Sequence, residues 1–432
     1  MRRPSTAHAA AVTAGLVLLG SAALAPAAVG ASASGGITLT IAMHSQAYTP
    51  AFGKLLDEYH QLHPNVSFKV ETVPFANYLN KILISHMSGN PPDIYYLYSL
   101  WGVQLERAGI ISRPPAGIVD SVKSDYTNVA VHGVTLDNAI WGIPTEIDDY
   151  MLVYNKKLLA QAGYKAPPAT WAQLLAMAKK LTRYGANGQI TQYGFAFLAG
   201  WDSAVVHPYL ALLWSNGGSY LTPGFKSCAL NSPAAVQALQ DEVALFREKA
   251  TNSSASVFNF PAGHIAMEII FPSTFEPQFK AVLKGQFNAT VGVAPIPRLK
   301  THKTLVYTWF WGVDSQSQHK AADWAFLRWL NMEVSSRTHT TRMGYYLVHQ
   351  IAAMPSNRVD LASGMVQRDP FLRAFAADLP HAVPEPNVDY GEEIKTILMN
   401  HIEAAWFGKE SPKQALARAC AEINPILRQN YP

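Results

Sequence analysis

The stretch ITLTIAMHSQAYTPAFGKLLDEYHQLHPNVSFKV (residues 37–70) holds the pattern from which the fold is predicted. It begins with an apolar run that is typical of a buried strand. Thr49 and Pro50 then carry the signals of a helix start, apolar residues follow at helical spacing, and Pro64 ends the helix. From Val66 the apolar residues alternate, as in a second strand. This order predicts parallel strands with the connecting helix on one face of a sheet.

The alternation of strands and helices continues along the chain. A second amphipathic helix around Tyr78 leads to a third strand at 93–98. Further helices are expected after the capping box of Thr170 and Gln173, after Ser232-Pro233, at 321–330 and after Ser411-Pro412. No flexible linker divides the chain, so we expect two α/β lobes joined by short crossing segments, with candidates at 141–144 and 293–297.

Composition excludes several classes of protein. The chain has 432 residues, of which 49% are hydrophobic and 15% charged, so it can bury large cores and is not expected to be disordered. Its formal charge of +4 comes without any long block of like charges. We therefore expect no nucleic acid among its partners.

The N-terminal segment has the features of an export signal. Met1-Arg2-Arg3 is followed by an apolar run and then by the small residues Ala31-Ser32-Ala33, with no acidic residue before position 37. We expect a signal peptide at 1–33, cleaved near Ala33, with a retained membrane anchor as the alternative. Because no cysteine lies near the cleavage region, we expect no lipid attachment and a soluble protein in the periplasm or outside the cell.

The two cysteines, Cys228 and Cys420, could form a disulfide in an oxidising compartment. Cys420 lies on the apolar face of a predicted helix, so a buried free thiol is an equally good interpretation.

Motifs of catalysis are missing, whereas residue types of a sugar site are present. The sequence has no G-x-S-x-G, H-E-x-x-H, C-x-x-C, Walker or G-x-G-x-x-G motif, and its 14 histidines lack ligand spacing. We therefore expect no enzyme activity, no cofactor and no metal site. Ten tryptophans and 19 tyrosines can stack on pyranose rings, while carboxylates such as Glu146, Asp148 and Asp149 can accept hydrogen bonds from hydroxyls. Glycoside hydrolysis by two of these carboxyls is the enzyme alternative.

A series of motifs, in order along nearly the whole chain after residue 33, resembles family 1 of the bacterial extracellular solute-binding proteins, the maltose-binding-like group of ABC importers. They are Pro92-Asp93-Ile94 with Ala108-Gly109-Ile110-Ile111, Trp141-Gly142-Ile143-Pro144 with Tyr154-Asn155-Lys156, Ala162-Gly163 with Pro167-Pro168-Ala169-Thr170-Trp171, Gly263-His264-Ile265-Ala266-Met267, and Val293-Ala294-Pro295-Ile296-Pro297.

The resemblance implies a periplasmic-binding-protein-like fold of the class II type, with two lobes that close by hinge bending on a ligand. Lobe 1 is expected at 37–142 plus about 296–340, and lobe 2 at about 143–295 plus 341–432. The implied function is that of a monomeric receptor that captures a mono- or oligosaccharide and delivers it to the membrane permease of an ABC transporter. A glycerol-phosphate-type or other polar solute is the alternative ligand. A secreted glycoside hydrolase and an adhesin are alternative classes of function.

The resemblance also implies ligand-binding residues. Those expected from the first lobe and the crossings are His44, Gln46, Tyr98, Ser99, Trp101, Glu146, Asp148, Trp309 and Trp311. Those expected from the second lobe are Trp201, Asp202, Tyr209, Ser273, Asn387 and Tyr390. Asp148 aligns best with a family carboxylate, and Glu146 is the alternative. Leu97 and Leu100 stand where maltose-type members often carry charged or aromatic contacts, which argues against maltose itself.

Overall fold

The computed structural model describes residues 36–432. The predicted signal peptide at 1–33 and its cleavage near Ala33 lie outside the described residues. No helix within 36–432 combines the length and the apolar character needed to cross a membrane.

Four sheets contain the strands of these residues. The strands are β1 (Ile37–His44), β2 (Val66–Val73), β3 (Ile94–Tyr98), β4 (Ile111–Ser112), β5 (Thr135–Leu136), β6 (Ala139–Ile140), β7 (Ile143–Asp149), β8 (Met151–Asn155), β9 (Arg183–Tyr184), β10 (Ile190–Gln192), β11 (Met267–Ile270), β12 (Val291–Ala294), β13 (Thr304–Asp314) and β14 (Ala382–Pro384).

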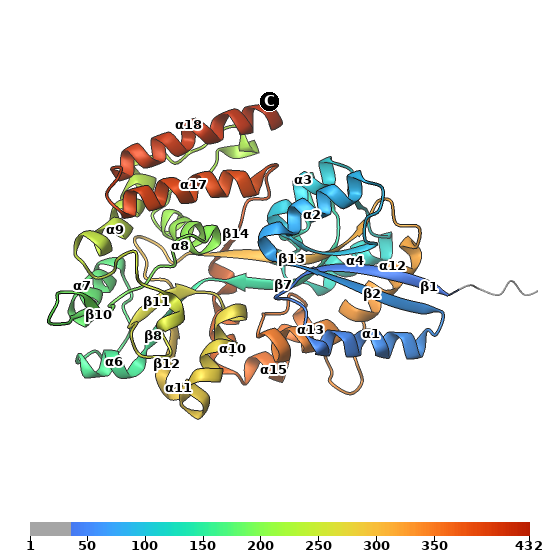
Figure 1. Cartoon of the computed structure of the whole chain (residues 1–432), viewed down its shortest axis with the longest axis horizontal. Coiled ribbons are helices and arrows are strands. Elements are labelled where there is room, and N and C mark those ends of the chain that lie inside the picture. The colour runs from blue at the N-terminus through green and yellow to red at the C-terminus, as the bar shows by residue number, and fades with distance from the viewer. Residues whose placement is uncertain (1–35) are drawn as a thin grey trace, which may run out of the picture. The chain divides into compact units, whose positions relative to one another are not determined.

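The largest sheet has seven strands and contains the three strands predicted first. Its order is β14-β13-β3-β1-β2, with β4 and β7 also paired to β13. The pairs β1–β2 and β1–β3 are parallel, as the alternating pattern predicted. The long strand β13 runs antiparallel to β3 and β7 and is buried along its whole length (Figure 1). This strand therefore organises the sheet, although it comes more than 200 residues after β3.

A second, antiparallel sheet has the order β11-β8-β12. Only Tyr150 separates its central strand β8 from β7 of the seven-stranded sheet. The segment around Trp141, predicted as a crossing, therefore lies just before a strand that leads from one sheet to the next. At this point Gly142 is required by close packing, because a Cβ atom there would lie 2.4 Å from the Phe310 ring.

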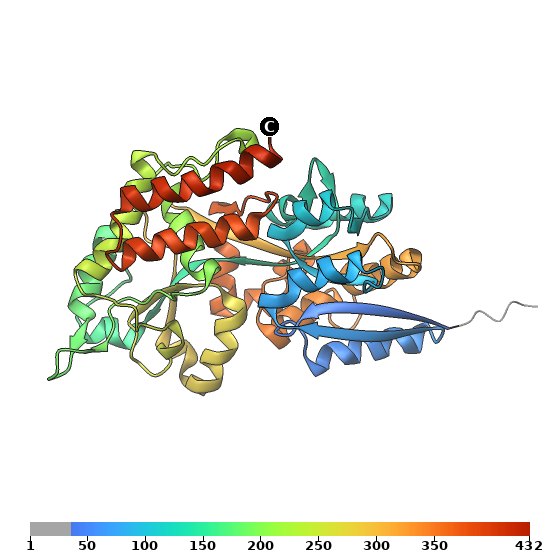
Figure 2. The ribbon, with the colours of Figure 1, turned by 45° about the horizontal axis from the view of Figure 1, so that its top comes forward.

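Helices cover both sheets (Figures 1 and 2). The helices are α1 (Pro50–Leu62), α2 (Phe75–Met87), α3 (Gly102–Arg107), α4 (Ala116–Asp125), α5 (Asn128–Gly133), α6 (Lys156–Gln161), α7 (Trp171–Leu181), α8 (Asp202–Ser215), α9 (Pro233–Arg247), α10 (Pro272–Leu283), α11 (Phe287–Thr290), α12 (Lys320–Asn331), α13 (Arg342–Tyr346), α14 (Arg358–Ala362), α15 (Gly364–Gln367), α16 (Pro370–Asp378), α17 (Gly391–Trp406) and α18 (Pro412–Asn430).

The predicted helix starts are confirmed. The Thr49 hydroxyl accepts a hydrogen bond from the backbone of α1, and Ser232 does the same for α9. Thr170 and Gln173 form the predicted capping box of α7, in which the Thr170 hydroxyl accepts from the backbone N–H of Gln173 and the Gln173 side chain accepts from the backbone N–H of Thr170. The structure adds a second capping box, at Ser411 of α18.

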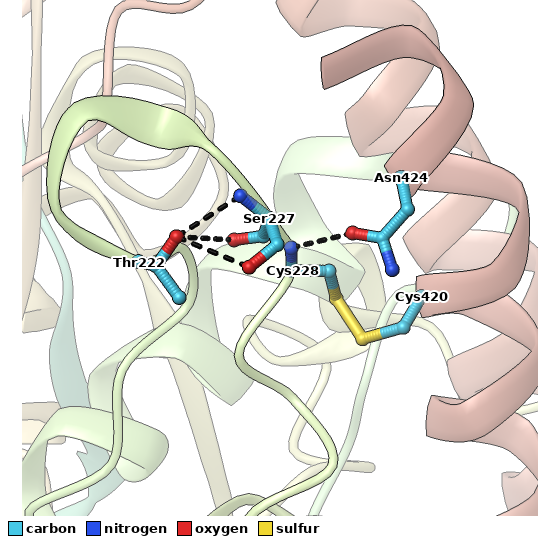
Figure 3. Close-up of a disulfide and its surroundings, with 5 residues drawn as sticks. All are labelled: Thr222, Ser227, Cys228, Cys420 and Asn424. Carbon is cyan, nitrogen blue, oxygen red and sulfur yellow. Dashed lines mark hydrogen bonds between the residues drawn. A yellow bond between two sulfur atoms is a disulfide. The ribbon is translucent and has the colours of Figure 1, made fainter. Parts of the chain in front are cut away.

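A disulfide joins Cys228, in the loop between α8 and α9, to Cys420 of α18 (Figure 3). Next to it, the Asn424 side chain accepts a hydrogen bond from the backbone N–H of Cys228 at 2.8 Å. Helix α18 packs along α17, and the two helices lie side by side in Figures 1 and 2. The covalent bond therefore ties the C-terminal helix pair to a segment 192 residues earlier in the chain.

Candidate functional site

A cleft of about 610 Å³ lies at the end of β1 and beside β3, β7 and β13. Several predicted ligand-binding residues line it: His44, Gln46, Tyr98, Glu146, Trp201, Ser273 and Trp309. Its other lining residues are Ala47, Thr49, Phe75, Ser203, Phe271, Pro277, Gln278, Tyr307, Gln350 and Ile351. The cleft thus combines aromatic rings with amide, hydroxyl and carboxyl groups.

Three neighbouring strands form the floor of the cleft. The register places Tyr98 of β3 and Glu146 of β7 on either side of Trp309 of β13, so the three side chains form a row across the sheet. Two residues along, the register pairs Asp148 with Tyr307. Because side chains two apart on a strand share a face, this second pair lies on the same side as Glu146 and Trp309.

Trp309 lies at the centre of an aromatic cluster on this floor. The centroid of its ring lies 4.3 Å from that of His44, 5.2 Å from that of Tyr96 and 5.5 Å from that of Tyr98, the last two in stacked geometry. Burial lowers the pKa of His44 to about 4, so the imidazole is neutral at physiological pH. The cluster fixes the orientation of the indole, and the 7% of Trp309 that stays exposed adds an uncharged aromatic group to the cleft lining.

A second group of lining residues comes from the segments around the three-stranded sheet. Phe271 directly follows β11, and Ser273 and Gln278 lie on α10. Trp201 immediately precedes α8, and its ring centroid lies 5.7 Å from that of Phe271 in T-shaped geometry. The cleft is therefore lined by elements of both larger sheets.

Glu146 and Asp148 form a buried pair of carboxyls in the cleft floor, with 4% and 0% of their surface exposed. Their partners are hydroxyl groups. Tyr96 donates to Glu146 at 2.7 Å, while Ser273 and Tyr307 donate to Asp148 at 2.9 and 3.2 Å. Burial raises the pKa of both carboxyls, and the charge of Asp148 raises the pKa of Glu146 further. The raised pKa values favour a state in which the two carboxyls share one proton and keep one negative charge.

A different set of buried charges lies behind Tyr98 and Ser203, and it surrounds the ammonium group of Lys395. Lys395 Nζ donates to the Tyr98 hydroxyl at 3.2 Å and to Ser203 Oγ at 3.1 Å. The carboxylates of Asp202 and Glu385 lie 3.7 and 3.8 Å from the same nitrogen. The cluster of Lys395, Asp202 and Glu385 thus joins α17, α8 and the segment after β14 to the side chains of the cleft.

Neighbouring groups complete this cluster. Glu385 accepts hydrogen bonds from Tyr98 and from His207, whose Nε2 lies 2.8 Å away. Burial alone would raise the pKa of Glu385, but His207 and Lys395 hold it below its ordinary value. Burial opposes the charge of Lys395 as well, yet Asp202, Glu392 and Glu385 raise its pKa. The two carboxylates of this cluster therefore share one cation, the ammonium group of Lys395.

The structure places the remaining predicted site residues outside the cleft lining. Asp148 lies directly behind Ser273 and Tyr307, and Asp202 belongs to the Lys395 cluster. Ser99 accepts a hydrogen bond from the backbone of Thr308 in the core. Each of these three side chains therefore has a hydrogen-bonding or ionic partner within the protein.

The aromatic and amide side chains among these predicted residues also lie outside the cleft lining. Trp101 donates to Glu392 at 2.9 Å, Tyr209 donates to the Ala235 carbonyl, and Trp311 is fully buried against Phe52. Asn387 donates to the Gly133 carbonyl at 3.1 Å. Tyr390 is 41% exposed and precedes α17 in a left-handed backbone conformation.

A second hollow, of about 680 Å³, lies at the start of α9, away from these residues. It is lined by small and polar residues such as Gly217, Ser219 and Pro233, with Lys300 as its charged side chain and without an aromatic ring among the described lining residues. It therefore lacks the aromatic surface that distinguishes the cleft.

The family comparison agrees with this architecture. The family described as bacterial extracellular solute-binding protein matches residues 45–332, a range that includes β13 and most of the cleft lining. The chain belongs to this family.

Individual relatives extend the likeness over nearly the whole chain. A Brucella abortus protein named as a binding protein is 25% identical over 409 residues, covering 92% of this chain and 94% of its own. The galactooligosaccharide-binding protein of Bacillus subtilis is 23% identical and covers 85% and 84%. An ABC transporter solute-binding protein of Thermotoga lettingae, solved with α-D-tagatose, has a TM-score of 0.76 at 20% identity and covers 90% and 99%. The likeness in structure confirms the predicted two-lobed fold class.

Some cleft residues were not predicted, although the sequence carries a signal for one of them. Tyr307 stands two residues before Trp309 on an apolar strand, so it had to share the face of Trp309. Phe75, Gln278 and Gln350 reach the cleft from helices and turns, and no local pattern distinguishes them from ordinary surface or core residues.

Proposed function

We propose that this solute-binding protein captures a polyhydroxylated ligand, a mono- or oligosaccharide, in the cleft and delivers it to the membrane permease of an ABC transporter. In this proposal the exported protein acts as a soluble monomer. The observation that carries the proposal is the row formed by Tyr98, Trp309 and Glu146 across three strands of the cleft floor.

The chemistry of this row suits a sugar. The faces of a pyranose ring are apolar and pack on aromatic rings, whereas its edges carry hydroxyls that need hydrogen-bonding partners. Trp309 and Tyr98 supply the aromatic surface, and Glu146, Gln46 and Gln278 supply polar groups around it. Two similar proteins support the same ligand class, because one is named for galactooligosaccharides and the other was solved with tagatose.

A phosphate-bearing solute fits the cleft less well. Binding of phosphate normally requires arginine, lysine or a helix N-terminus directed at the anion. Lysine and arginine are both absent from the described residues that line the cleft. At the N-terminus of α10, which reaches the cleft, Ser273 directs its hydroxyl to Asp148, so the negative charge of the carboxyl pair already lies there and would repel an anion.

The carboxyl geometry favours binding without turnover. Glycoside hydrolases need two carboxyls on either side of the scissile bond. Glu146 and Asp148 come from one strand and one face, and Asp148 is fully buried behind its hydroxyl partners.

We further propose that ligand capture closes two lobes, at 37–142 plus about 296–340 and at about 143–295 plus 341–432. The direct succession of β7 and β8, which belong to different sheets, gives the chain a short connection about which bending can occur. A ligand that touches both groups of lining residues favours the closed state by its difference in affinity for the two states.

The test is a thermal-unfolding screen of the exported chain against sugars, polyols, glycerophosphodiesters and amino acids, after refolding to remove carried ligand. A solute at 100 times its dissociation constant adds about 2.7 kcal/mol to the free energy of unfolding, which raises the melting temperature by a few degrees. We expect shifts with a group of related sugars and not with phosphodiesters.

A pair of tryptophan variants then locates the site. Trp309→Leu should weaken the affinity for the selected sugar by roughly tenfold or more, because it removes the stacking surface. Trp141→Leu is the matched control, since Trp141 is partly buried, lies over Arg113 and is outside the cleft. Unchanged sugar affinity in Trp309→Leu would contradict the assigned site, and shifts with phosphodiesters alone would contradict the ligand class.

A further inference from the structure

The two carboxyls of the cleft floor have hydrogen-bonding partners but lack a cation. Among residues 36–432, no lysine, arginine or histidine forms an ion pair with Glu146 or Asp148. His44, the one imidazole that lines the cleft, is neutral at physiological pH. Asp148 Oδ1 is buried without any hydrogen-bonding partner.

Such an arrangement is costly for the unliganded protein. A buried carboxylate is stabilised by a cation or several donors, and otherwise it takes up a proton. The hydroxyl groups of Tyr96, Ser273 and Tyr307 donate hydrogen bonds to some of the oxygens of the two carboxyls. Glu146 can accept further hydrogen bonds from the cleft, because it is one of the lining residues although 96% of its surface is buried.

We propose, on the basis of the function proposed above, that the ligand itself supplies the cation and is a polyhydroxylated amine, such as an amino sugar or an imino sugar, whose ammonium group binds at Glu146. The two carboxyls share one proton and keep one negative charge. With that proton on Asp148, the ammonium group would donate a charge-assisted hydrogen bond to the Glu146 carboxylate, which is shorter and stronger than a hydrogen bond between neutral groups.

The aromatic floor supports the same ligand chemistry. Trp309 is the cross-strand neighbour of Glu146, so an ammonium at the carboxylate also lies close to the indole. Cations are attracted to the face of an indole, most strongly where water is excluded. A neutral sugar can use the stacking surface, whereas a polyhydroxylated amine can use both the surface and the unpaired charge.

A metal cation fits the site less well. Metal ions of the hard type need several oxygen ligands, and the described residues contain no cluster of three or more aspartate, glutamate, histidine or cysteine side chains able to hold one. A single ammonium group, by contrast, needs one carboxylate and a few neutral acceptors.

The test uses matched sets of sugars in the wild-type protein, with affinity measured by titration calorimetry. Each set contains a neutral sugar, its amino analogue and the N-acetylated analogue, for example glucose with glucosamine and galactose with galactosamine, as single sugars and as disaccharides, together with imino sugars. We expect the amine to bind at least about tenfold more tightly than both uncharged members of its set.

Two variants identify the group responsible. Glu146→Gln should remove the preference for the amine and leave the uncharged members of the set with similar affinities. Asp120→Asn, at an exposed position outside the cleft, controls for the change in net charge and should keep the preference.

Each outcome decides the proposal. Neutral or N-acetylated sugars that bind as tightly as the amines would overturn this inference and leave the proposed function intact. Binding of no member of any set would overturn both. A preference for amines that survives in Glu146→Gln would overturn the assignment to this carboxyl.

Discussion

The cleft floor and the region behind it both contain buried acidic side chains, but the two regions balance their charge in opposite ways. Behind the floor, the carboxylates of Asp202 and Glu385 share the ammonium group of Lys395 as their cation. In the floor, Glu146 and Asp148 have hydroxyl partners and no cation. Compensated charge can hold elements of a fold together, whereas uncompensated charge destabilises the fold and requires another explanation. We conclude that the first cluster serves the structure and the second serves the ligand.

The largest expected effect comes from the substitution that removes the cation of the Lys395 cluster. Lys395→Met should lower the free energy of unfolding by about 3–5 kcal/mol, because it leaves the carboxylates of Asp202 and Glu385 buried without their cation. Urea unfolding measures the loss. Lys179→Met is the control, since Lys179 is half exposed in its ion pair with Glu248 and should contribute less than about 1 kcal/mol. Equal small losses in both variants would show that the cluster is not a stabilising element.

The next effect separates stability from ligand binding. Replacing Cys228 and Cys420 by serine should cost about 2–4 kcal/mol, because the disulfide closes a loop of 192 residues in the unfolded chain. Neither cysteine lines the cleft, so the affinity of the folded double variant for its ligand should equal that of the wild type. Thermal unfolding and calorimetry on the same preparation test both statements. A weaker affinity would connect the C-terminal helix pair to the cleft.

The effect that is smallest for each step of the measurement concerns the pH dependence of the carboxyl pair without a cation. Burial raises the pKa of folded Glu146, so between the ordinary glutamate pKa and the raised one the folded protein holds a proton that the unfolded chain has lost. Stability must therefore fall as pH rises through this window, by at most about 1.4 kcal/mol per pH unit. Glu146→Gln cannot titrate and should show a flatter profile of stability from pH 5 to pH 8.

Urea midpoints at several pH values test this prediction. Glu333→Gln, at an exposed position, should retain the wild-type profile. Parallel profiles for wild type and Glu146→Gln would mean that the Glu146 carboxyl is not held uncharged in the fold.

Much of the fold could be predicted because its signals are local. The spacing of apolar residues and the caps Thr49 and Thr170 fix where helices begin, and both caps are present in the structure. The position of β13 beside β3 could not be predicted, because pairing of strands more than 200 residues apart leaves no periodic pattern.

The candidate site could be predicted in part, because some of its residues also stand out in the local sequence. Trp309 and Glu146 stand out as an aromatic and an acidic residue next to predicted crossings, and both line the cleft. Lys395 could not be found, since a lysine on a helix normally faces solvent, and only the distant Asp202 and Glu385 explain its burial. The partners of a buried charge are set by tertiary structure.

The central claim, that the uncompensated carboxyl of Glu146 serves the ligand, is tested most directly by titration calorimetry of the solute that gives the largest thermal shift. The account predicts that Glu146→Gln weakens the affinity by at least about tenfold while its free energy of unfolding equals or exceeds that of the wild type at pH 7. Wild-type affinity in Glu146→Gln, or a loss of stability like that of Lys395→Met, would contradict the claim and make the carboxyl pair a structural element.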